Sequence, residues 1–109
     1  RRLADAASEH LQASKNGEDP DRIGTIGFCS GGSAALSFAC STTDLSCVIS
    51  CYPNNIIKPF GVNTQAVIDR VKDLCCPMLG LVGKDDPNPS QEDLEVLRQE
   101  LDKHGKSYD

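Results

Sequence analysis

The fold is decided by the pentapeptide Gly27-Phe28-Cys29-Ser30-Gly31, which follows a strand-like run at residues 22–26 and leads into small and apolar residues at 32–39. A strand, a nucleophile bracketed by glycines and then a helix form the pattern of a nucleophile elbow, here with cysteine at its centre. Strand and helix nearly touch at such a turn, so we expect Gly27 and Gly31 to leave no room for side chains. The stretch predicts an α/β fold.

The predicted turn gives Cys29 the properties of a catalytic nucleophile. Its sulfur projects away from the sheet at the positive end of the following helix, which favours the reactive thiolate. The backbone N–H of Ser30 points at a developing oxyanion. Cysteine is also a small hydrophobic residue that is often merely buried, so the pentapeptide alone leaves both roles open.

Composition limits the classes of partner. The chain has 109 residues, of which 39% are hydrophobic and 25% charged, and its formal net charge is -5. No apolar run approaches the roughly 18 residues of a membrane span. We therefore expect no membrane anchor. Apart from Arg1-Arg2, lysine and arginine are scattered singly, so we expect no nucleic-acid partner. A complete α/β-hydrolase domain needs about twice this length, so residues 1–109 are predicted to be a single partial domain.

The cysteine content raises two structural alternatives. The six are Cys29, Cys40, Cys47, Cys51, Cys75 and Cys76. No signal peptide supports a secreted disulfide framework, and no Cys-x2-Cys pair supports a zinc site. We therefore expect reduced thiols, no metal and a cytoplasmic protein. The thiols also keep open a second function, that of a non-enzymatic, redox-responsive or interaction protein on a hydrolase scaffold.

Strands and helices are predicted to alternate along the chain. Strands are expected at residues 22–28, buried on both faces, at 45–52 and at 77–83, with a fourth opening at 106–109. Helices are expected at residues 3–15, after Gly31 and from Ser90 to the stop signal at Gly105, and a short one is possible before Leu74. This alternation predicts a parallel sheet flanked by helices, with Cys29 and Asp86 both at the carboxyl ends of strands.

A cysteine nucleophile needs a base and an acid that orients the base. Asp86 is the preferred acid because it lies further along the loop after the strand, and Asp85 is the runner-up. The only histidines are His10 and His104. His10 precedes the turn, and His104 ends a helix, where it favours the local dipole. The base is therefore expected outside this chain.

Several separate stretches together resemble the dienelactone hydrolase family. They are residues 22–32, the run Cys76-Pro77-Met78-Leu79-Gly80-Leu81-Val82-Gly83, the loop Asp86-Pro87-Asn88-Pro89-Ser90 and the junction His104-Gly105-Lys106-Ser107-Tyr108. The resemblance covers nearly the whole chain from Asp19 onward.

The resemblance implies a partial α/β-hydrolase that opens enol-lactones or esters through a thioester. By resemblance, Cys29 is the nucleophile, Asp86 the triad acid and Ser30 one oxyanion donor, with no metal or organic cofactor. It places the histidine beyond Asp109, and it places the N-terminal strands and the second oxyanion donor before Arg1. The partner implied is a small-molecule lactone or ester, while the natural substrate and the oligomeric state stay open.

Overall fold

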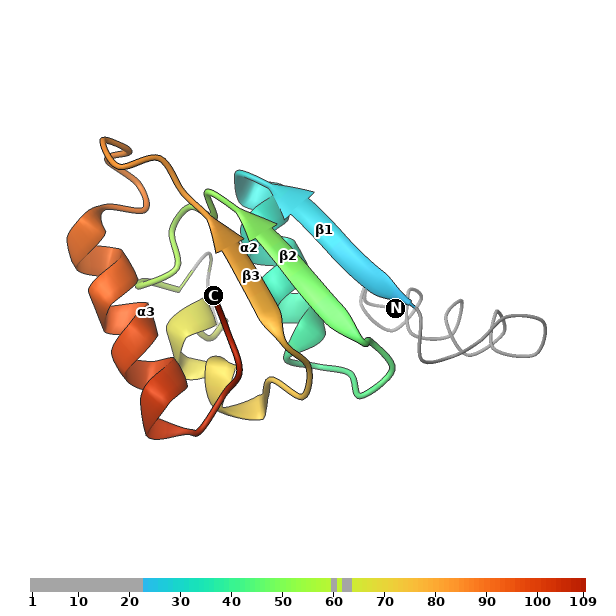
Figure 1. The fold of residues 1–109 in the computed structure, drawn as a ribbon. Coiled ribbons are helices and arrows are strands. Elements are labelled where there is room, and N and C mark those ends of the chain that lie inside the picture. The colour runs from blue at the N-terminus through green and yellow to red at the C-terminus, as the bar shows by residue number, and fades with distance from the viewer. Residues whose placement is uncertain (1–22, 60, 62–63) are drawn as a thin grey trace.

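The structure, a computed structural model, describes residues 23–59, 61 and 64–109. Among these residues, a three-stranded sheet carries two α-helices and two short 3-10 turns (Figure 1). The predicted helix at residues 3–15 and His10 lie outside the described residues.

The sheet is parallel throughout, as predicted. It contains β1 (Gly24–Phe28), β2 (Cys47–Cys51) and β3 (Met78–Leu81), side by side in chain order. Phe28 of β1 stands opposite Cys51 of β2, which in turn stands opposite Leu81 of β3. The three carboxyl ends are therefore level, and the loops that follow them leave from one edge of the sheet (Figure 1).

The last residues begin a fourth strand beside β3. Tyr108 forms an isolated parallel bridge with Met78. The N–H of Met78 donates to the Ser107 carbonyl at 3.0 Å, and the N–H of Gly80 donates to the Asp109 carbonyl at 2.8 Å. The predicted opening of a strand at residues 106–109 is confirmed.

Helix α3 (Gln91–Lys103) begins and ends where the sequence predicts. The Ser90 hydroxyl accepts the Asp93 N–H at 3.1 Å, and the Asp93 carboxylate accepts the Ser90 N–H at 3.0 Å, which completes a capping box. At the other end, Gly105 has φ 66°, and the Lys106 N–H reaches back to the Leu101 carbonyl. This is a Schellman stop, in which glycine is favoured.

Helix α2 (Ser30–Ala39) follows β1 and packs its buried side against the sheet. The segment from residue 64 to 74 forms two 3-10 turns, η2 (Val67–Asp69) and η3 (Val71–Asp73), instead of the single short helix that the spacing suggested. Arg70 joins the turns, and its N–H bonds to Val67 three residues back, the pattern of a 3-10 turn rather than an α-helix.

One face of the sheet is buried under α2, the 3-10 turns and α3 (Figure 1). Strand residues on this face, such as Val48 and Met78, are almost fully buried. The helices contribute the rest of the core, which includes Ala35, Leu36, Ala39, Ile68, Val71, Leu97 and Leu101.

The opposite face of the sheet is open in the described residues. Ile26, Phe28 and Leu81 are about half exposed, at 54%, 55% and 50%. The prediction that the first strand is buried on both faces is therefore wrong for these residues, because every described helix packs on the same side. No helix among the described residues has the length and apolar character needed to cross a bilayer.

Candidate active site

Cys29 occupies the turn between β1 and α2. Its backbone has φ 58° and ψ -121°, a conformation that is rare for a residue with a side chain. The turn is held by a hydrogen bond from the Cys29 N–H to the Cys51 carbonyl at 3.0 Å, while the Cys29 carbonyl accepts the Gly32 N–H at 2.9 Å. Cys29 is solvent-exposed. A strained residue held on both sides by backbone hydrogen bonds is typical of functional sites.

Two glycines make this turn sterically possible. A Cβ on Gly27 would lie 1.9 Å from the Gly31 carbonyl oxygen, and a Cβ on Gly32 would lie 2.6 Å from the Cys51 carbonyl oxygen. A Cβ on Gly31 would meet no atom within 4 Å. The expectation for Gly27 is confirmed, whereas Gly31 is not crowded, because it is its carbonyl and not its Cα that approaches β1.

A buried serine fixes the start of α2. Ser50 of β2 is fully buried, and its hydroxyl donates to the Gly32 carbonyl at 2.8 Å. Ser30 is the first residue of α2, and the first-turn N–H groups of a helix have no intrahelical acceptor. The Ser30 N–H can therefore donate a hydrogen bond to an oxyanion. Its role as an oxyanion donor stays a prediction.

The loop after β2 approaches the sulfur. The Asn54 Nδ2 lies 3.5 Å from Cys29 Sγ, its backbone N–H donates to the Cys29 carbonyl at 3.4 Å, and its own carbonyl accepts a short hydrogen bond from the Ser33 hydroxyl. Sequence reasoning treated Pro53-Asn54-Asn55 as the end of a strand, and it left open that residues 53–73 line the pocket. The one available signal was that polar residues follow the strand at the carboxyl edge of the sheet.

The loop that carries Asp86 docks against the same region. The Asp86 carboxylate accepts the Asn88 N–H at 2.9 Å. The Asn88 side chain pairs twice with Asn55, since its Oδ1 accepts the Asn55 N–H and its Nδ2 donates to Asn55 Oδ1, both at 3.0 Å. Asp86 is half-buried, whereas Asp85 is exposed. The loop after β3 is thereby fastened to the loop that contacts Cys29.

His104 lies far from this edge of the sheet. It follows the last turn of α3, whose first residue comes soon after the Asp86 loop, and the 13 residues of the helix span about 20 Å. Its Nε2 lies 3.4 Å from a Glu100 carboxylate oxygen. His104 therefore does not reach the Cys29 thiol.

Two further cysteines are poorly suited to thiolate chemistry. Burial raises the pKa of Cys40 from 9.0 to about 12, and burial also raises the pKa of Cys76. Both thiols stay protonated at neutral pH, and the thiol form is the less reactive one.

Within residues 23–59, 61 and 64–109, no group of three or more His, Cys, Asp or Glu side chains is placed to hold a metal ion.

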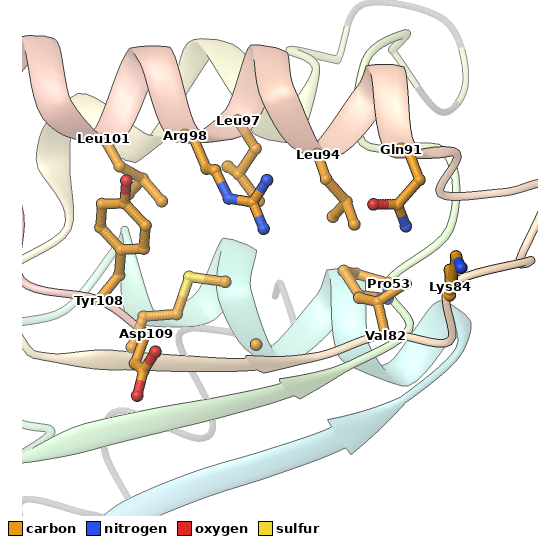
Figure 2. A pocket seen from close by; sticks show the side chains of 12 residues that line it. Pro53, Val82, Lys84, Gln91, Leu94, Leu97, Arg98, Leu101, Tyr108 and Asp109 are labelled. Carbon is orange, nitrogen blue, oxygen red and sulfur yellow. The ribbon is translucent and has the colours of Figure 1, made fainter.

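Among the hollows that the described residues form, two lie beside α3 or near the Cys29 turn. One, of about 270 Å³, lies between α3 and β3. Figure 2 shows Leu94, Leu97 and Leu101 pointing from the helix toward the strand, with Leu94 above Pro53 and Val82 and Leu101 beside Tyr108. Its lining includes neither Cys29 nor Asp86. The other is a groove of about 680 Å³ that borders the Cys29 turn through Ser30 and Asn54.

The sequence is similar to those of known proteins. The sequence model of the Dienelactone hydrolase family matches residues 1–109. A protein named "Putative carboxymethylenebutenolidase" from Salmonella typhimurium is 33% identical over 100 residues, which are 91% of this chain and 37% of that protein. One of the same name from Escherichia coli strain K12 is 33% identical over 100 residues, covering 91% of this chain and 36% of the relative. The chain thus spans little more than a third of these relatives.

Solved structures share the fold. A structure described as a "Putative Dienelactone Hydrolase" from Klebsiella pneumoniae superposes with a TM-score of 0.82 at 27% identity, over 97% of this chain and 44% of that one. A puromycin-hydrolysing peptidase from Mycobacterium tuberculosis superposes with a TM-score of 0.76 at 19% identity, over 96% of this chain and 20% of that one. The second likeness concerns the fold alone.

Proposed function

The chain belongs to the dienelactone hydrolase family and has part of an α/β-hydrolase fold, and from this premise we propose that the protein containing it hydrolyses lactones or esters with Cys29 as the nucleophile. The observation that carries the proposal is the strained, exposed position of Cys29 between β1 and α2. This position supports the proposal because, in a nucleophile elbow, the reacting atom stands clear of the sheet at a helix N-terminus.

In the proposed reaction, the Cys29 thiolate attacks the carbonyl carbon of the substrate. The carbonyl oxygen becomes an oxyanion, which the Ser30 N–H stabilises together with the partial positive charge of α2. The intermediate collapses to a thioester, and the bond to the ring or alcohol oxygen breaks. That oxygen leaves as an enolate or alkoxide and takes up a proton, so the lactone ring opens.

Water then hydrolyses the thioester and releases the acid and the Cys29 thiol. We assign the base for this step to a histidine outside these 109 residues, oriented by Asp86. Two features support the assignment of the acid. Asp86 lies at the same edge of the sheet as Cys29, and the paired side chains of Asn55 and Asn88 fasten its loop there. We also propose that the protein is cytoplasmic and that its substrate is a small molecule.

The test uses the full-length protein with an enol-lactone and with para-nitrophenyl acetate. Replacing the sulfur in Cys29→Ala is expected to reduce kcat by at least about a thousandfold, since the covalent step is lost. Cys75→Ala, at an exposed cysteine remote from the turn, is the matched control and should keep full turnover. Mass spectrometry of quenched reactions should find the acyl group on Cys29. Undiminished turnover by Cys29→Ala contradicts the proposal.

A further inference from the structure

Most of the residues that line the groove of about 680 Å³ carry polar side chains. One wall is the face of α2 formed by Ser30, Ser33, Ala34 and Ser37. The other wall is formed by Asn54, Asn55, Thr64, Gln65, Val67 and Arg70. Both walls therefore contribute hydroxyl or amide groups, and Arg70 supplies a positive charge.

Arg70 is held in place but has capacity for another ligand. Its N–H donates to the Val67 carbonyl and its carbonyl accepts the Asp73 N–H, both at 2.9 Å, so the backbone is fixed between the two 3-10 turns. Its Nη1 donates to the Ser37 hydroxyl at 2.6 Å. A guanidinium has five N–H donors, and no ion pair joins Arg70 to a carboxylate within the described part of the chain.

The groove connects Arg70 to the proposed nucleophile. At one end lie Ser30, the neighbour of Cys29, and Asn54, whose Nδ2 is 3.5 Å from Cys29 Sγ. At the other end Arg70 contacts Ser37. An α-helix rises 1.5 Å per residue, so the Cys29 and Ser37 backbones are separated by on the order of 12 Å. A small lactone bound at Cys29 is too short to reach Arg70.

We propose that this groove selects extended substrates whose far end carries a carboxylate, which Arg70 binds while the ester carbonyl lies at Cys29. Half-esters of linear dicarboxylic acids have this form. Arginine suits the role because its planar fork can bind both oxygens of a carboxylate. This inference rests on the proposed function and adds to it a substrate class and a specificity-determining residue.

The experiment compares three para-nitrophenyl esters on the full-length protein: the half-ester of suberate, the same compound with its free carboxylate methylated, and the shorter half-ester of succinate. Arg70→Gln is expected to raise KM for the suberate half-ester by about tenfold to a hundredfold, the range for a lost charge-assisted contact. The methylated and succinate compounds should be little affected. Arg70→Lys should fall between, and Arg98→Gln, at an arginine of α3 outside this groove, should match the unmodified protein.

A second variant guards against misfolding of Arg70→Gln. Gln65→Glu changes charge but not shape at an exposed position of the groove lining, and it should raise KM for the suberate half-ester alone. Equal effects on charged and methylated substrates, with a lower Tm, would mean that Arg70 only ties the 3-10 turns to α2. Such equal effects, or no effect in either variant, would overturn the inference. Turnover that does not depend on Cys29 would instead overturn the proposed function.

Discussion

At Cys29 the backbone has φ 58° and ψ -121°, and the two glycines that permit this turn, Gly27 and Gly32, are not the pair that brackets Cys29 in the sequence. The pattern correctly indicated a strand, a turn and a helix, and it identified Gly27. It could not indicate Gly32, because the crowding there comes from the Cys51 carbonyl, which is brought close only by the pairing of β1 with β2. A local sequence pattern does not predict contacts between segments that are distant in the chain.

The two bracketing glycines should therefore respond differently to the same substitution. Gly27→Ala places a methyl group 1.9 Å from the Gly31 carbonyl oxygen, and we expect a loss of about 3 kcal/mol in the free energy of unfolding. Gly31→Ala meets open space in the first turn of α2 and should be neutral or stabilising by up to about 1 kcal/mol. Chemical denaturation of both variants measures the difference. Similar losses in the two would contradict the assigned geometry.

At the scale of elements, α3 was predictable in detail, whereas the contacts between loops were not. The boundaries of α3 depend on local signals, namely the Ser90 cap and Gly105. The pairing of Asn55 with Asn88 joins residues 33 positions apart and depends on the order of the strands. Sequence reasoning placed Cys29 and Asp86 at one edge of the sheet but missed the asparagines that fasten their loops together.

This pairing gives a prediction about the Asp86 loop. Asn88→Ala removes both hydrogen bonds to Asn55, and we expect the stability to fall by only about 1 kcal/mol because the site is exposed. Turnover by the full-length protein should fall by about tenfold or more, since small displacements of positioned groups are costly. Steady-state kinetics beside a denaturation curve separates the two effects. Asp85→Ala, on the same loop, is the control; if it is the more damaging change, Asp85 is the triad acid.

At the scale of the whole molecule, the sheet has one covered and one open face in the described residues. The sequence reasoning expected β1 to be buried on both sides, because residues 22–28 have the mainly apolar character of a central parallel strand. Such a run shows that both faces of a strand suit a protein interior, but not which segments cover them. The chain spans 37% of the relative from Salmonella typhimurium, and the apolar open face is a surface that further chain can cover.

Leu79 on this face provides a test, because its side chain is 37% exposed in the described residues. In the isolated 109-residue chain, Leu79→Asp should leave the unfolding transition nearly unchanged and reduce self-association, since an exposed apolar patch promotes contact between copies. In the full-length protein, the same substitution should cost about 3 kcal/mol or more, as expected for a charge placed in an interior. Light scattering and denaturation of both proteins provide the comparison. A mild effect in the longer protein would show that this face is open there too.

The order of the strands also has a consequence for biosynthesis. Because β1, β2 and β3 are neighbours in space in the same order as in the chain, each strand that leaves the ribosome finds its partner already made. The Cys29 turn is stabilised by the Cys51 carbonyl, and the loop after β3 then attaches to the loop after β2. Domains form from the N-terminal side during synthesis. The Cys29 turn is therefore expected to take its strained geometry when β2 pairs with β1, before the loop that carries Asp86 has left the ribosome.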